Sequence, residues 1–238
     1  MSEIHDKQKK TILNLLGEKS VMKQDVFSNT VTVFNLLKEV VKESADDLSH
    51  ESSKIDKRIT ISYKEVSTQS MQIKVAGDIL EFYMHSNVFE FDHSHPMFKT
   101  GYIKNNPLNS YCGIINVYNF LADSYKYNRL NDLGDLIARI FINREKKFFI
   151  ETRTQIGYKY MNFSDQPVDK ETLIEIINEL IIFAVTFDLF TPPYESVRQV
   201  SVQEMQEKQS SNSLRTGKRL GYAGTGITNS TNDEEINL

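Results

Sequence analysis

The spacing of apolar residues changes near residue 58, and this change limits the folds that are open to the chain. Before this point, large apolar residues recur every three to four positions, as on one face of an α-helix: Met22, Val26, Phe27, Val31, Phe34, Leu37 and Val41. After it, they alternate with polar residues, as on half-buried strands: Ile59, Ile61, Tyr63, Met71, Ile73, Val75, Leu80, Phe82 and Met84. The pattern predicts helices first and a meander of β-strands second.

The N-terminal segment predicts two helices joined by a short turn. Gly17 follows the apolar residues at positions 12, 13, 15 and 16, and it has the place of a residue just past a helix end. Glycine suits that place because it adopts the left-handed conformation without steric cost. Ser20 is then a candidate N-cap for a second helix. We expect a helical hairpin over residues 1–50, and a solvated helix end and linker over residues 42–57.

Further strands and helices are predicted beyond the meander, which turns at Gly77-Asp78. Apolar runs predict a strand at residues 111–117 and a hairpin made of residues 148–152 and 156–160. Helical spacing predicts a helix whose buried face is formed by Leu130, Leu133, Ile137, Ile140 and Phe141. A long helix is predicted from the candidate N-cap Asp169 to Leu189.

These elements do not alternate as βαβ units, so the predicted fold class is α+β. We expect a mainly antiparallel sheet of about five to six strands, with the N-terminal helical hairpin and the long C-terminal helix packed on it. The expected organisation is a helical hairpin over 1–50, an α+β core domain over 58–209 and a disordered polar tail over 210–238. The tail has too few large apolar residues to offset an ordering entropy of about 1–2 kcal/mol per residue.

Composition excludes several classes of protein. Hydrophobic residues make up 39% of the chain, and 28 basic against 32 acidic side chains give a net charge of −4, as in ordinary globular proteins. The single cysteine, Cys112, rules out an intrachain disulfide and argues against a cysteine-based zinc site. The most apolar run, residues 180–187, is far shorter than the ~20 residues of a membrane span. No signal-peptide pattern is found at the N-terminus. We expect a cytoplasmic protein that does not contact a membrane.

Histidine and aspartate residues gather between residues 85 and 95. His85, His93 and His95 lie there with Asp92, and Asp123 follows at a distance. Imidazole and carboxylate groups are ligands of zinc and other divalent metals. The cluster supports the hypothesis of a metal-dependent hydrolase or ligand-binding enzyme. A solvated polar loop at residues 92–96 is the favoured interpretation, because no complete metal-binding motif accompanies the histidines.

Hydrogen-bonding side chains are unusually dense between residues 111 and 139. Asn119, Arg129 and Asp132 are candidate ligand-binding residues, because a guanidinium group can bind a carboxylate or phosphate in a forked geometry. The alternative is structural: Asp132 caps a following helix, while Asp123 and Arg129 form an ion pair. We favour the structural interpretation.

Basic and aromatic residues mix between residues 144 and 160. The cations are Arg144, Lys146, Lys147, Arg153 and Lys159, and the rings are Phe148, Phe149, Tyr158 and Tyr160. Such a mixture is typical of single-stranded nucleic-acid binding, in which cations meet phosphates and rings stack on bases. Strand alternation leaves few rings on an exposed face, and the whole chain is acidic. Nucleic acid is therefore not the favoured partner.

The favoured hypothesis is a non-enzymatic binding or regulatory module that acts through a protein interface. Its partner is another protein, or a second copy that associates through the N-terminal helices. No cofactor is predicted under this hypothesis. A divalent metal belongs only to the hydrolase alternative.

Overall fold

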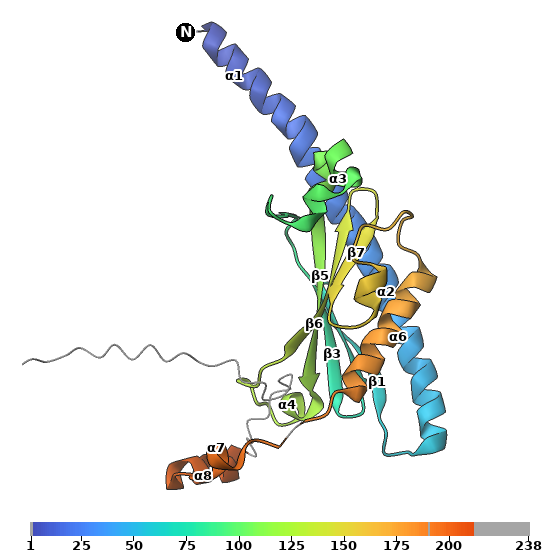
Figure 1. Cartoon of the computed structure of the whole chain (residues 1–238), viewed down its shortest axis with the longest axis vertical. Helices are drawn as coiled ribbons and strands as arrows, with labels where there is room; N and C mark the ends of the chain where they lie inside the picture. Colours follow the sequence, from blue (N-terminus) through green and yellow to red (C-terminus); the bar gives the residue numbers. More distant parts are fainter. Residues whose placement is uncertain (1, 190, 212–238) are drawn as a thin grey trace, which may run out of the picture.

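A computed structural model describes residues 2–189 and 191–211 (Figure 1). These residues form an α+β fold with one antiparallel sheet of seven strands, which confirms the predicted class and exceeds the expected number of strands. The strand order is β1-β2-β3-β5-β6-β7, and β4 pairs with β5 as well. Most of the tail predicted over 210–238 lies outside the described residues.

One continuous helix occupies the N-terminal part of the chain, so the predicted helical hairpin is wrong. It consists of α1 (Ser2–Leu15), the π-helical turn η1 (Leu16–Ser20) and α2 (Val21–Ile55). Gly17 lies inside the π-turn, and Ser20 is itself helical, with φ −75° and ψ −40° and no capping hydrogen bond from its side chain. The helix continues through these residues because helix formation is cooperative. Packing holds α2 in place, and each residue added to its N-terminal end contributes one further backbone hydrogen bond.

The predicted meander is present as β1 (Ile61–Ser67), β2 (Ser70–Val75) and β3 (Asp78–Met84). Val75 pairs with Asp78, and Ala76 has a φ of 52°, so Ala76 and Gly77 form the two-residue turn. The remaining strands are β4 (Phe89–Glu90), β5 (Tyr111–Leu121), β6 (Asp135–Asn143) and β7 (Phe148–Thr152). β5 runs through the middle of the sheet between β3 and β6.

Two predictions about the second half of the chain are wrong. Residues 135–143, expected in a helix, form β6, and residues 156–159 of the expected hairpin form α5 (Ile156–Lys159). β6 is covered on both faces, since Ile137, Ile140 and Ile142 belong to one core and Phe141 to another. A strand buried on both faces has a nearly continuous apolar run, which matches the helical period equally well.

α2 and α6 (Lys170–Thr186) cover one face of the sheet and share a single hydrophobic core with it. Large buried members of this core are Phe34, Leu37, Phe82, Ile115, Ile140, Phe148 and Leu180. Asp169 caps α6, and its carboxylate accepts a hydrogen bond of 2.8 Å from the Thr172 amide. The helix expected to reach Leu189 ends at Thr186, because Phe187 leaves the helical conformation (ψ 104°). It is not the last helix, since α7 (Tyr194–Val197) and α8 (Val202–Ser211) follow.

Short elements close the two ends of the sheet. η2 (Pro96–Lys99), α3 (Gly101–Asn105) and η3 (Pro107–Ser110) lie where β5 begins, and α4 (Ala122–Lys126) lies where β5 ends (Figure 1). A second, smaller core at the first end contains Met97, Ile103, Cys112, Phe141 and Phe149.

Candidate functional site

The N-terminal helix projects beyond the sheet, past α3 (Figure 1). Its large apolar side chains Ile4, Ile12, Leu13, Leu15 and Leu16 are between 50% and 69% exposed. Between residues 4 and 55, the first buried residue is Met22. An isolated helix of this length is marginal in water, and a cluster of exposed apolar side chains is typical of a binding surface. We call residues 4–16 the projecting helix.

Positive charge lies next to these apolar side chains. Lys7, Lys9 and Lys10 are exposed, and Lys9 lies one helical turn before Ile12 and Leu13. Residues 7–17 contain no acidic side chain. The projecting helix therefore offers an apolar surface with a basic flank.

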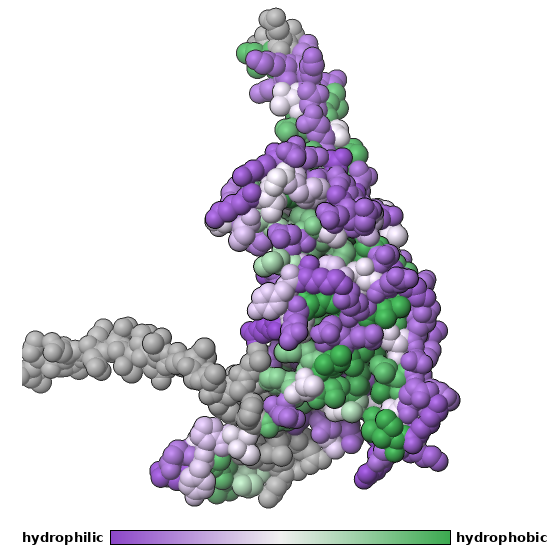
Figure 2. Space-filling view, turned by 45° about the vertical axis from the view of Figure 1, so that its right-hand side comes forward, coloured by the Kyte–Doolittle hydropathy of each residue, from purple (hydrophilic) through white to green (hydrophobic). Residues whose placement is uncertain are grey.

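A groove runs between α2 and α6 on the helix-covered side of the molecule. Its volume is about 590 Å³, and its lining is Val40, Glu43, Ser44, Asp47, Leu48, Ile174, Asn178, Ile181 and Ile182. In Figure 2, apolar surface gathers on the lower part of this side, where the two helices lie. Among the described residues that line the groove, two are acidic and none is basic. The groove is thus apolar with an acidic edge.

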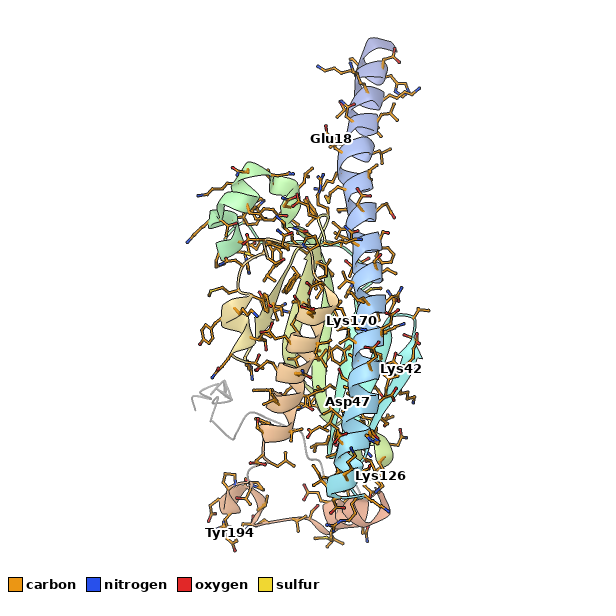
Figure 3. The ribbon with its side chains drawn as sticks, turned by 90° about the vertical axis from the view of Figure 1, so that its right-hand side faces the viewer. Glu18, Lys42, Asp47, Lys126, Lys170 and Tyr194 are labelled. Atoms are coloured by element: carbon orange, nitrogen blue, oxygen red, sulfur yellow. The ribbon has the colours of Figure 1, made fainter. Side chains whose placement is uncertain are left out.

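Asp47 lies on α2 and Lys170 lies at the start of α6, the two helices that form this groove (Figure 3). Lys170 Nζ lies 2.8 Å from Glu43 Oε2 and joins the start of α6 to α2. Asp47 is exposed and has no ion pair among the described residues. Lys42 lies on the side of α2 turned away from α6 (Figure 3). Asp47 is therefore the carboxylate of the acidic edge that is available to pair with a cation of another molecule.

Two of the candidate ligand-binding residues form a closed ion pair at the β5 end of the sheet. Arg129 Nε lies 3.0 Å from Asp132 Oδ2, and the two side chains are only 7% and 3% exposed. Ser124 Oγ donates a hydrogen bond of 2.6 Å to the same carboxylate. Asp132 does not cap a helix, because β6 follows it. Both details of the structural interpretation are therefore wrong, since Asp132 caps no helix and Arg129 pairs with Asp132 instead of Asp123.

Asn119, the third candidate, is buried on the helix-facing side of β5. Its side-chain oxygen has no hydrogen-bond partner among the described residues. Together with Asp135, Ile137, Phe183 and Phe187 it lines a cavity of about 10 Å³. This is the volume of about one water molecule. The cavity can accept a water-sized hydrogen-bond donor, and it has no room for a substrate.

The three histidines of the predicted cluster are not brought together. Each packs against a different phenylalanine, with ring centroids 4.7–4.8 Å apart: His85 on Phe89, His93 on Phe98 and His95 on Phe91. His95 Nε2 lies 3.4 Å from Glu151 Oε1, and its Nδ1 accepts a hydrogen bond from the Met97 amide. The imidazole groups therefore serve local packing and turn structure.

The aspartates of that cluster are also separated. Asp92 accepts hydrogen bonds from the side chain and backbone of Ser94, and these bonds lower the pKa of its carboxyl group. Asp123 lies on α4, and the eleven residues of β5, about 33 Å of extended chain, separate the two ends of the sheet. Among residues 2–189 and 191–211, no three histidine, cysteine or carboxylate side chains gather as a metal site requires.

The basic and aromatic segment at residues 144–160 buries two of its four aromatic rings. Phe148 and Phe149 are 2% exposed and cannot stack on a base. Lys159 Nζ lies 2.6 Å from Glu175, and Lys147 Nζ lies 3.5 Å from Glu145. Tyr158 is 79% exposed and Tyr160 is half-buried. One fully exposed ring offers less stacking surface than the several aromatic side chains on which successive bases of single-stranded nucleic acid stack.

The uncovered face of the sheet carries a shallow basic pocket of about 390 Å³ beside α4. Lys64, Lys74 and Lys126 line it with Tyr125. Tyr125 donates a hydrogen bond to Glu81, and burial together with this bond raises the pKa of its phenol. The three lysines come from β1, β2 and α4, so only the sheet register brings them together. Their combined charge attracts anions in general.

Sequence reasoning did not identify the α2–α6 groove. Its residues belong to two helices more than a hundred residues apart, and their spacing along each helix resembles that of any buried face. The exposed apolar residues of the projecting helix were visible in the sequence. The sequence does not show that these side chains are exposed, because their exposure depends on where the sheet ends.

Comparison with protein-family models, curated proteins and solved structures finds no match to this chain. The fold and its surfaces define an α+β protein built on a seven-stranded antiparallel sheet. No helix within the described residues combines the length and the apolarity needed to cross a membrane.

Proposed function

We propose that this chain is a non-enzymatic protein-interaction module that binds through its projecting helix. One observation carries the proposal: Ile12, Leu13, Leu15 and Leu16 are all at least half exposed on a helix that lies outside the folded core. Burying such a side chain fully contributes about 1.5–3 kcal/mol. Four neighbouring side chains therefore contribute several kcal/mol towards the costs of association.

The arrangement of polar groups supports binding over catalysis. The histidines and aspartates that the hydrolase alternative needs are distributed among separate local contacts. The buried Arg129–Asp132 pair is closed to a ligand, and the cavity beside Asn119 is of water size. The proposal includes a cytoplasmic location, which agrees with a free and buried Cys112.

The test is to place charge on the projecting helix of the full chain. The variant Ile12→Glu, Leu16→Glu should abolish associations of the wild-type protein, because burying a carboxylate in an apolar contact is costly. Leu130→Glu is the matched control, since Leu130 is an apolar residue that is 84% exposed in a loop far from α1. Sedimentation velocity measures self-association, and affinity isolation from cell extract measures other partners. Unchanged association in the double variant contradicts the proposal.

A further inference from the structure

We propose that the projecting helix of one copy docks in the α2–α6 groove of a second copy. This inference rests on the proposed function and names its partner. The mode is the familiar one of an amphipathic helix laid in an apolar groove. Three observations support it: the continuity of the N-terminal helix, the match in length and the match in charge.

Continuity of the helix prevents docking within one chain. Leu16 and Val40 belong to the same uninterrupted helix. At 1.5 Å per residue they are about 36 Å apart along its axis. The projecting helix cannot reach the groove of its own chain unless α2 is broken, and α2 is held in the main core. The projecting helix can therefore reach such a groove only on another molecule.

The groove and the segment of the projecting helix that would enter it have similar lengths. The groove extends from Val40 to Leu48 on α2 and from Ile174 to Ile182 on α6. Each stretch is about 12 Å long at 1.5 Å per residue. The segment from Lys9 to Leu16 is about 10 Å long by the same measure, and its apolar residues from Ile12 to Leu16 cover about 6 Å of it. The segment can thus lie along most of the groove, with its apolar side chains over about half of the groove's length.

The charges of the two surfaces are opposite. Lys7, Lys9 and Lys10 precede the apolar residues of the helix, while Glu43 and Asp47 edge the groove. Glu43 already pairs with Lys170. Asp47 is therefore the carboxylate that we assign to a lysine of the incoming helix. Complementary charge of this kind selects a partner and sets its orientation.

In a two-fold dimer, the projecting helix and the groove of each copy are both covered. Each copy contributes one helix and one groove, so the pair contains two equivalent contacts and leaves neither surface open. Once the first contact has formed, the second becomes intramolecular and is favoured by a high effective concentration.

Cysteine cross-linking of the full chain tests the contact directly. The single variants Ile12→Cys and Asn178→Cys are mixed under mild oxidation. Cys112 is 1% exposed, and burial raises the pKa of its thiol, so the native cysteine does not react. We expect a disulfide-linked dimer in the mixture and none in either variant alone. A cross-link in Ile12→Cys alone, which would indicate paired projecting helices, overturns the inference, as does the absence of any cross-link.

A charge exchange provides the second measurement. Lys9→Glu and Asp47→Lys should each weaken self-association about tenfold, because two contacts per dimer become repulsive. The double variant should restore the wild-type affinity to within about threefold. Lys42→Glu is the matched control, because Lys42 faces away from the groove (Figure 3). If the double variant is no stronger than the single variants, the inference is wrong.

The two proposals fail in different ways. A wild-type chain that is monomeric at every concentration, or that dimerises without the mixed cross-link, overturns the docking of one copy in another. The proposed function still stands in either case if binding to some protein depends on Ile12 and Leu16. Association that does not depend on these two residues overturns the proposed function itself.

Discussion

Gly113 of β5 lies directly beneath Thr30 of α2. A methyl group placed on Gly113 would be 2.1 Å from Thr30 Oγ1, well inside van der Waals contact. Thr30 is 1% exposed, and its hydroxyl donates a hydrogen bond of 2.7 Å to the Val26 carbonyl. The long helix approaches the central strand this closely because the strand has no side chain there.

Gly113→Ala should therefore lower the free energy of unfolding by about 1–3 kcal/mol, the usual cost of overpacking a core. Adding Thr30→Ala should recover part of this loss, because it removes two of the three atoms that the new methyl group meets. Urea denaturation of the single and double variants measures both values. A Gly113→Ala protein as stable as the wild type would contradict the close contact.

Gly17→Ala should have the opposite effect. Gly17 lies inside the helix, and an added methyl group would meet nothing within 4 Å. Alanine is favoured over glycine in a helix by about 1 kcal/mol. We expect slower amide hydrogen exchange in residues 8–20 and little change in global stability, because this segment lies outside the core. Faster exchange in the variant would show that Gly17 needs a conformation that alanine cannot adopt.

The cap of α6 should give stability that depends on pH. Hydrogen bonds from the Thr172 side chain and backbone lower the pKa of Asp169 below its ordinary value of 3.8. A group whose pKa is lower in the folded state stabilises the fold fully above its unfolded pKa, and loses this effect as the pH falls through its folded pKa. Asp169→Ala should cost about 1 kcal/mol at pH 7.

Asp169→Asn provides the control for this prediction, because asparagine caps a helix without titrating in this range. The stability difference between the wild type and Asp169→Ala should be constant above about pH 5 and should shrink below 3.8. The difference between Asp169→Asn and Asp169→Ala should persist at low pH. Thermal denaturation between pH 2 and pH 7, converted to free energies, gives both curves.

The histidine segment should hold no metal. His93 and His95 pack on different phenylalanine rings, and no three histidine, cysteine or carboxylate side chains among the described residues are placed to hold a metal ion together. We expect less than one equivalent of zinc or manganese after purification without chelator. The variant His93→Ala, His95→Ala should lose about 1 kcal/mol, mainly from the lost turn at Met97. Stoichiometric metal that disappears in this variant would restore the hydrolase hypothesis.

The types of several elements were readable from the sequence because one face of each is buried and the other is solvated. Val26, Phe34 and Leu37 mark α2 in this way, and Ile73 and Leu80 mark the meander. The N-cap of α6 at Asp169 was also readable, because a cap is made by neighbours in the chain. The α+β class followed from the order of these elements.

Tertiary structure decided what the local pattern left open. The sequence of β6 matches two periods, and only its position between β5 and β7, covered on both faces, makes it a strand. Glycine is common just past the end of a helix, yet in this chain the helix that contains α2 continues through Gly17. The distance between Asp123 and the histidines, and the groove formed by α2 and α6, come from contacts between residues far apart in the chain. Such contacts depend on how whole elements pack, which the spacing of neighbouring residues does not encode.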